Sequence, residues 1–198
     1  MIRTKKNLAP WLGLILIGLC DAQASDTYKI DPAHSVVSFG VHHFLGVTKG
    51  KFTRITGTVE LDREHPENSS VSVEIPVRNI DTGIRKRDDH LLSAEFFDAA
   101  KYPQIIFKSR SVKQTGPQTG NVLGDLTMHG VTRPMTLHVK LLSPTGTQDS
   151  KSTLRWVVTT DPLKRRDFNL MFSSTAETVS GIGQDVSINM EIETSKGG

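Results

Sequence analysis

Histidine is the residue type with the widest chemical potential in this chain, because imidazole can bind a metal or exchange a proton near neutral pH. The sequence contains seven histidines. His34 and His42 have the same parity along an extended chain and His43 has the opposite one, so at most two of the three can meet on one surface. Zinc needs three or four convergent ligands. The spacing therefore predicts no metal site.

The sequence also lacks the common catalytic motifs of hydrolases. It contains no G-x-S-x-G, no S-x-x-K and no H-E-x-x-H, and its only cysteine is Cys20. We therefore predict no catalytic residue and no cofactor. If the chain were an enzyme, the evident acid–base candidates would be His34, His90 and His129.

Two clusters of charged residues are each compatible with more than one function. The first is Arg85-Lys86-Arg87-Asp88-Asp89 and the second is Lys164-Arg165-Arg166-Asp167. Either cluster could bind a phosphate through charge-assisted hydrogen bonds. Either could equally be a solvated surface with local ion pairs. The second cluster could also make transient contact with an anionic lipid surface.

Residues 1–24 have the pattern of a secretory signal peptide. A basic start precedes an apolar run of about ten residues, which is too short to span a bilayer, and Ala22-Gln23-Ala24 provides a small-x-small cleavage signal. We expect cleavage before Ser25 and export to the periplasm. Lipidation at Cys20 is the alternative, although Leu19 is larger than the residue that normally precedes a lipidated cysteine.

Removal of this segment changes the charge and redox arguments. The full chain has 24 Lys and Arg against 21 Asp and Glu. The segment holds three of these bases and one acid, so 21 and 20 remain. A nearly neutral chain argues against nucleic acid as a partner. With no cysteine left, stability must come from one apolar core, and residues 25–198 suffice for a single domain.

The apolar residues of this domain alternate with polar ones at the period of a β-strand. Eight segments show the pattern, and they indicate an antiparallel all-β fold with one face in a core. A sandwich and a barrel both fit, but Gly57 and Gly124 within strands favour the curvature of a barrel. Turn residues separate the strands, for example Gly130 to Pro134. The predicted strands are 37–41, 55–61, 71–77, 106–112, 122–128, 135–141, 154–158 and 186–192.

Residues 87–107 interrupt this alternation. Leu91, Leu92, Glu95, Phe96 and Ala99 follow spacings of three and four, which predicts an amphipathic helix with a charged start. Pro103 would end it before the next strand. Residues 161–184 show no steady period, and we expect them to cover one end as a loop with a turn of helix.

Five motifs in register carry a resemblance to a known family. In this order they resemble the YceI-like family of polyisoprenoid-binding periplasmic proteins, over about Tyr28 to Glu193. The motifs are Asp31-Pro32-Ala33-His34-Ser35 with His42-His43, Gly50-Lys51-Phe52 with Gly57, the block 87–107, the segment 123–132, and Arg166-Asp167-Phe168 with 182–186.

The resemblance implies a lipocalin-like, eight-stranded antiparallel barrel with a short helical cover. Its elongated apolar cavity would bind, carry or store an isoprenoid or similar long-chain lipid, such as a quinone tail or a polyprenyl phosphate, without catalysis. In that fold the inward faces would line the cavity and Leu91, Leu92, Phe96 and Phe97 would cover it. The expected ligand-binding residues are Val37, Phe39, Val41, Ile75, Phe96, Leu126, Met128, Leu137, Trp156, Ile188 and Met190.

Four polar residues are candidates for contact with a lipid headgroup: His34, Arg87, His90 and His129. Two other functions stay open at this point. The chain could be an enzyme acting on an isoprenoid or quinone. It could also be a stress-associated interaction protein whose barrel interior is a packed core without a void.

Overall fold

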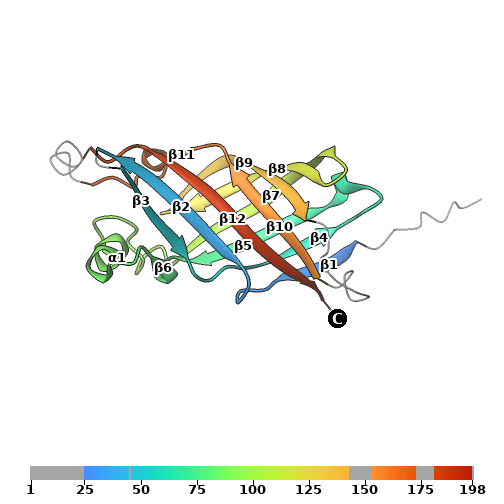
Figure 1. Ribbon diagram of the computed structural model, residues 1–198, viewed down its shortest axis with the longest axis horizontal. Coiled ribbons are helices and arrows are strands. Elements are labelled where there is room, and N and C mark those ends of the chain that lie inside the picture. The colour runs from blue at the N-terminus through green and yellow to red at the C-terminus, as the bar shows by residue number, and fades with distance from the viewer. Residues whose placement is uncertain (1–24, 45, 143–152, 173–180, 198) are drawn as a thin grey trace, which may run out of the picture.

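The computed structural model of the protein describes residues 25–44, 46–142, 153–172 and 181–197 (Figure 1). The predicted signal peptide and Cys20 lie outside these residues. The described chain is mostly β-sheet, with one α-helix and three 3₁₀ turns. The elements are β1 (Asp26–Ile30), β2 (Val36–His43), β3 (Gly46–Phe52), β4 (Thr56–Leu61), η1 (Pro66–Asn68), β5 (Ser70–Pro76), η2 (Val77–Asn79), β6 (Ile80–Asp81), α1 (Arg85–Leu92), β7 (Gln104–Gly116), β8 (Thr119–Met128), β9 (Val131–Leu142), β10 (Thr153–Thr160), β11 (Leu163–Lys164), η3 (Arg165–Phe168) and β12 (Asp185–Lys196).

The strands form a closed eight-stranded antiparallel barrel, as predicted. The ring runs β1-β4-β5-β7-β8-β9-β10-β12, and it closes because β1 also pairs with β12, with Tyr28 opposite Lys196. Closure leaves no exposed edge in this ring. Each of the eight predicted segments overlaps one strand, but the first of them is β2 rather than the ring strand β1. The sequence did not predict β1, β3, β6 or β11.

Three of the barrel strands are broken in the middle. β1 and β2 both pair with β12, β1 near its carboxyl end and β2 nearer its amino end. The next strand is broken in the same way, because β4 pairs with β1 and β3 pairs with β2. The third is broken between β5, which pairs with β4, and β6, which pairs with β3. Because of these breaks, the strand pairs differ between the two ends of the barrel. One end has the pair β1–β4, and the other has the pairs β2–β3 and β3–β6.

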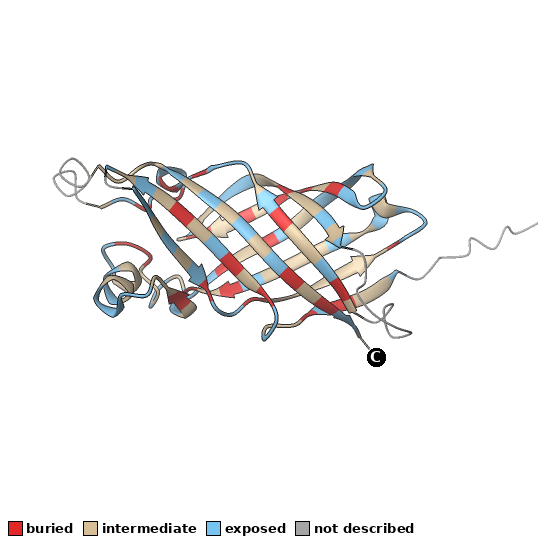
Figure 2. Cartoon of the chain, viewed as in Figure 1, coloured by how far each residue is buried: buried red, intermediate tan, exposed pale blue. Residues whose placement is uncertain are grey.

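The alternation of the sequence reappears as alternating burial along several strands (Figure 2). On β8, for example, Val122 and Leu126 are buried whereas Leu123 is exposed. The buried apolar side chains form one cluster inside the barrel. Their removal from water supplies the main stabilising term for a chain whose described residues contain no cysteine.

Gly57 and Gly124 both occur where strands approach closely. A Cβ at Gly57 would collide with the Ser72 carbonyl, and Gly57 has a positive φ of 158°. A Cβ at Gly124 would collide with the Lys108 carbonyl and the Phe107 ring. Each glycine thus permits strand contacts that a side chain would prevent, in agreement with a strongly curved sheet.

The predicted helix exists but is shorter than expected. α1 begins at Arg85 and ends at Leu92, so Glu95, Phe96 and Ala99 lie in the turns that follow it. The Ser93 hydroxyl donates to the His90 carbonyl at 2.8 Å, and this local bond competes with helix continuation. Asp98 then has a positive φ of 45°. No helix among the described residues is long and apolar enough to cross a membrane.

Two connections refine the predicted loops. The turn between β8 and β9 is only His129-Gly130, with positive φ at both residues, which matches a tight hairpin turn. Pro134, which we expected in the turn, lies within β9, where the pairing with β10 has not yet begun. The segment 161–184 does include a turn of helix, η3, in its described part.

Candidate functional site

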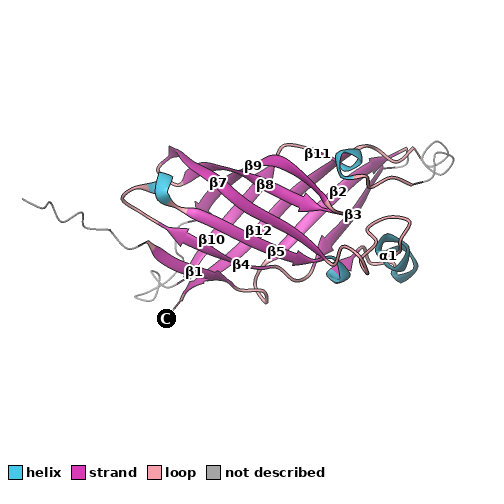
Figure 3. Ribbon diagram, turned by 180° about the vertical axis from the view of Figure 1, so that it is seen from behind, coloured by secondary structure: helices cyan, strands magenta, loops and turns pink. Residues whose placement is uncertain are grey.

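The barrel encloses an apolar cavity of about 600 Å³. This volume lies in the range of cavities that hold small organic ligands, about 300–1,000 Å³. The cavity begins at the end of the barrel where α1 and η3 lie (Figure 3) and continues between the strands toward the middle. We refer to this end as the mouth.

Strand parity places the predicted residues in the cavity wall. On β2, Val37, Phe39 and Val41 point inward, and on β12 Ile188 and Met190 do so. Ten of the eleven predicted ligand-binding residues line this cavity; besides those five, they are Ile75, Phe96, Leu126, Met128 and Leu137.

Trp156 lines a second, smaller cavity of about 260 Å³ toward the opposite end. Val73, Leu137 and Met190 line both cavities, so the two spaces meet at these side chains. The barrel interior is therefore hollow along much of its length rather than a packed core.

Aromatic rings and α1 cover the mouth. The ring of Phe96 stacks on Phe172 with centroids 4.5 Å apart, and it meets Phe97 edge-on at 5.2 Å. Phe96 and Phe97 are buried, and Leu91 lines the cavity, as the sequence predicted. Leu92 packs against the core without lining the cavity.

Two of the four predicted headgroup residues lie at this mouth. Arg87 and His90 are both on α1 and both line the cavity. Arg87 Nε donates to Thr82 Oγ1 at 2.8 Å and its Nη2 donates to the Thr82 carbonyl at 2.7 Å. These bonds hold the guanidinium at the cavity wall. His90 Nε2 lies 3.0 Å from Glu95 Oε2, and the His90 ring contacts Phe172.

The other two headgroup candidates lie elsewhere. His129 occupies the β8–β9 turn, where its Nδ1 lies 3.1 Å from the Phe168 carbonyl and its ring packs edge-on against Tyr102. His34 lies in the connection between β1 and β2. Neither residue lines either cavity.

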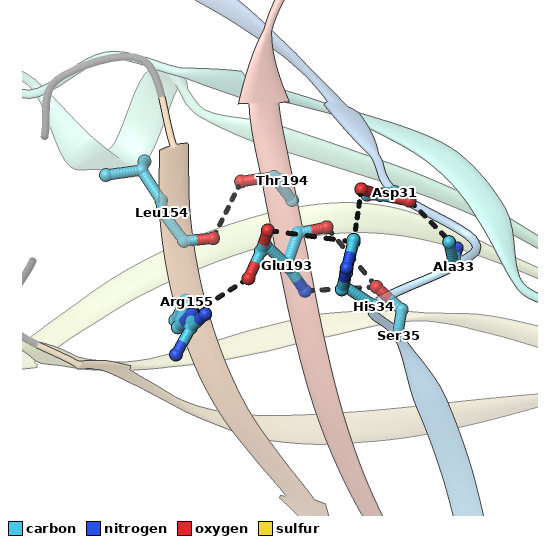
Figure 4. Close-up of polar contacts among 8 residues, drawn as sticks. All are labelled: Asp31, Ala33, His34, Ser35, Leu154, Arg155, Glu193 and Thr194. Carbon is cyan, nitrogen blue, oxygen red and sulfur yellow. Dashed lines mark hydrogen bonds and ion pairs between the residues drawn. The ribbon is translucent and has the colours of Figure 1, made fainter. Parts of the chain in front are cut away.

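His34 belongs to a polar network on the outside of the barrel (Figure 4). Its Nδ1 lies 2.7 Å from Asp31 Oδ2 and 4.0 Å from Glu193 Oε1, and Arg155 Nε donates to Glu193 at 2.8 Å. The hydrogen bond with Asp31, followed by the charges of Asp31 and Glu193, raises the pKa of His34. The same hydrogen bond, with that from the Ala33 amide, lowers the pKa of Asp31.

This network brings together three groups that could ligate a metal: Asp31, His34 and Glu193, whose ligand atoms lie within 4.8 Å of one another. The sequence reasoning missed the cluster because Glu193 is distant in the chain. Arg155 already pairs with Glu193, and His34 already hydrogen-bonds Asp31, so both carboxylates have partners. The arrangement is therefore that of an ion-pair network that ties the β1–β2 connection to β10 and β12.

Two ionisable residues of the cavity wall were not among the predicted headgroup contacts. His43 lines the cavity, and its parity with Val37, Phe39 and Val41 could have indicated this. Arg165 is only 2% exposed. It donates to the carbonyls of Leu170 and Gly183, at 2.8 and 2.9 Å, and so connects η3 to the segment that precedes β12. No local signal distinguishes it from its exposed neighbours Lys164 and Arg166.

Sequence comparisons find relatives of this chain over about two thirds of its length. A model of the YceI-like domain matches residues 28–194. A UPF0312 protein of Pseudomonas syringae pv. syringae is 41% identical over 138 residues, which cover 67% of this chain and 71% of that protein. Protein YceI of Salmonella agona is 39% identical over 142 residues, 70% of this chain and 73% of that protein.

Solved structures share the fold of this chain. BcnA of Burkholderia cenocepacia superposes with a TM-score of 0.73 at 26% identity, over 83% of this chain and 98% of that chain. A polyisoprenoid binding domain from Saccharophagus degradans, implicated in plant cell wall breakdown, superposes with a TM-score of 0.61 over 86% of this chain and 98% of that chain. The latter is 18% identical, so it supports the fold alone.

Proposed function

This chain belongs to the YceI-like family, and from that premise we propose that it binds an isoprenoid or similar long-chain lipid in its cavity and carries or stores it in the periplasm without chemical change. The observation that carries the proposal is the apolar cavity of about 600 Å³. Burial of a lipid chain there is favoured by about 0.8 kcal/mol per methylene before ordering costs. The family and the fold shared with a polyisoprenoid binding domain motivate the choice of ligand class, and the predicted signal peptide of residues 1–24 motivates the choice of compartment.

Arg87 and His90 give the mouth a polar side suited to a headgroup. A guanidinium can bind a phosphate oxygen through charge-assisted hydrogen bonds, and an imidazole can hydrogen-bond a quinone or a phosphate. We therefore propose that the lipid chain lies inside and its headgroup lies beside α1. His34 and His129 are not part of this proposal, because neither lines a cavity.

The hollow interior argues against the interaction protein with a packed core. A carrier releases the lipid unchanged, whereas an enzyme releases it chemically altered. For the enzyme, His90 is the acid–base candidate of the original three that lines the cavity. A lipid that is released chemically altered, with the alteration lost in His90→Ala, would favour the enzyme.

The test is the mass of lipid retained by the natively purified protein, in wild type and in a blocked variant. Leu126→Trp adds a large ring at an inward position of β8 and should greatly reduce lipid retention. Leu123→Trp is the matched control, because it is the same change on the same strand at a side chain that is 40% exposed. If wild type holds no lipid and acquires none on incubation with isoprenoids, the proposal is wrong. Equal retention by both variants would place any bound lipid outside the cavity.

A further inference from the structure

The exposed apolar side chains are unevenly distributed over the barrel. Six large hydrophobic residues are exposed among the residues that the structure describes, and four of them belong to elements at the mouth. The most exposed is Phe44, at 78%, in the turn between β2 and β3. Ile84 precedes α1, Val47 is on β3, and Met171 follows η3. Leu123 and Leu142, on β8 and β9, are the two that lie elsewhere.

Three segments that carry these residues lie at the same end of the barrel (Figures 1 and 3). We call residues 42–44, 46–49, 84–92 and 163–172 the rim. The first and third are tied through Gly183, whose amide donates to the His42 carbonyl at 2.7 Å and whose carbonyl accepts from Arg165 at 2.9 Å. The second and third meet where the His90 ring contacts Phe172.

The rim also has an excess of basic residues. Its three segments contain seven Lys and Arg against three Asp, although residues 25–198 as a whole are nearly neutral. Exposed bases stand beside the exposed apolar residues: Arg85 and Lys86 follow Ile84, and Lys49 has the parity of Val47 on β3. At the opposite end, the turn between β4 and β5 is acidic, with Asp62, Glu64 and Glu67 against Arg63.

Separate exposed apolar side chains flanked by basic residues are suited to contact with the surface of an anionic lipid bilayer. An anionic bilayer attracts each nearby base by about 1 kcal/mol, and side chains such as Phe44 and Met171 can enter its interfacial layer. A bilayer is also the place where a long-chain lipid is available. A mouth held against it would allow the chain to enter the cavity without crossing water.

We propose that the rim docks on anionic membrane surfaces, with the cavity mouth facing the bilayer. In this proposal the membrane is the source or the destination of the bound lipid, so the purpose of docking rests on the proposed lipid-binding function. The docking itself needs only the side chains of the rim, so it can be measured without a lipid in the cavity.

The experiment is sedimentation of the mature protein with vesicles. Wild type should bind vesicles of phosphatidylethanolamine with phosphatidylglycerol, bind weakly to phosphatidylcholine alone, and lose binding at high salt. The variant Arg85→Gln/Lys86→Gln should reduce partitioning about thirty-fold, as expected for two bases. Phe44→Ser/Ile84→Ser/Met171→Ser should reduce it at least tenfold. None of these residues lines the cavity.

The matched control is Leu123→Ser/Leu142→Ser, which removes the exposed apolar residues outside the rim and should bind vesicles as wild type does. Absence of binding to anionic vesicles, or equal losses in the rim and control variants, would overturn the proposal. So would a rim that associates with a second copy of the chain, seen as a dimer that the triple serine variant dissociates without any vesicle binding.

Failure of docking and failure of lipid binding are separable. If the purified protein retains lipid but does not bind vesicles, the docking inference is wrong and the proposed function stands. If it binds vesicles through the rim but never holds a lipid, docking stands and the carrier function is wrong.

Discussion

The two ends of this barrel are formed by the same long strands but are closed in different ways. At the end opposite the mouth, β1 bridges β4 and β12 by backbone pairing, and Tyr28 and Thr194 there are essentially inaccessible to solvent. At the mouth, β6 has two residues and pairs with β3, and α1 contains no buried residue. We infer that the closed end supplies stability and that the mouth supplies access. The predictions below test this division.

The largest expected effect is on stability at the closed end. Ile55 is 1% exposed and lines the second cavity. Ile55→Ala should lower the free energy of unfolding by about 2–5 kcal/mol, because it removes buried methyl groups and enlarges a void. Ile84→Ala is the same change at a mouth residue that is 53% exposed, and it should cost about 0.5 kcal/mol or less. Urea denaturation of both variants measures the difference, and equal losses would contradict the division.

A smaller effect is expected from one buried hydroxyl at the closed end. Thr194 Oγ1 accepts from Trp156 Nε1 at 3.2 Å and donates to the Leu154 carbonyl at 3.4 Å. Thr194→Val keeps the shape but leaves both partners unsatisfied, which should lower the free energy of unfolding by about 1–3 kcal/mol. Thr132→Val removes an exposed hydroxyl bonded to Thr127 and should have little effect. If Thr194→Val left the free energy of unfolding unchanged, these two hydrogen bonds would contribute little to the stability of the closed end.

At the mouth, the expected change is in binding rather than in folding. Arg87→Gln removes the cation from the cavity wall, so affinity for a polyprenyl phosphate should fall about tenfold or more, while affinity for an uncharged quinone should change little. Arg85→Gln is the control, because Arg85 is exposed on the same helix and does not line the cavity. Titration with a soluble polyprenyl phosphate analogue and with a soluble quinone analogue measures the two affinities. Equal loss for both ligands would indicate a structural role for Arg87 through Thr82.

The smallest effect concerns pH and the network around His34. Because the pKa of His34 is raised in the folded protein, its contribution is fully present below the unfolded value of about 6.5 and is lost as pH rises through the folded pKa. Because the pKa of Asp31 is lowered, its contribution is present above about 3.9 and is lost as pH falls through the folded pKa.

The two contributions therefore overlap between about pH 4 and pH 6.5. The difference in Tm between wild type and His34→Gln should be largest in this window and should shrink on both sides of it. Thermal unfolding across the pH range measures the difference, with His65→Gln as the control, since His65 is an exposed histidine outside this network. A difference that does not vary with pH would mean that the pair contributes no linked stability.

The strands and the cavity wall were largely predictable because their signal is local. The side chains of a strand alternate between its two faces, so the position of Val37, Phe39 and Val41 in one wall follows from their spacing. The helix was predictable in existence but not in extent. The spacing from Leu91 to Ala99 suits a helix, whereas the Ser93 bond to His90 ends it at Leu92.

The candidate site was predicted less evenly than the fold. Arg87 and His90 were proposed together with His34 and His129, and only the first pair lines the cavity. Their sequence neighbourhoods do not distinguish them. His129 is held by the Phe168 carbonyl and His34 by Asp31, which are contacts of a tight turn and of a strand junction.

By itself, the sequence determined an antiparallel all-β fold with an apolar inner face, because alternation is a property of neighbouring residues. Only the tertiary structure decided which end closes and which opens. That difference depends on β12 pairing with β1 at one end and β2 at the other, between residues more than 100 positions apart. The same long-range pairing brings Glu193 to His34, and the packing of η3 buries Arg165 at the mouth. Pairings over such distances leave no periodic trace in the chain, so they appear only when it is folded.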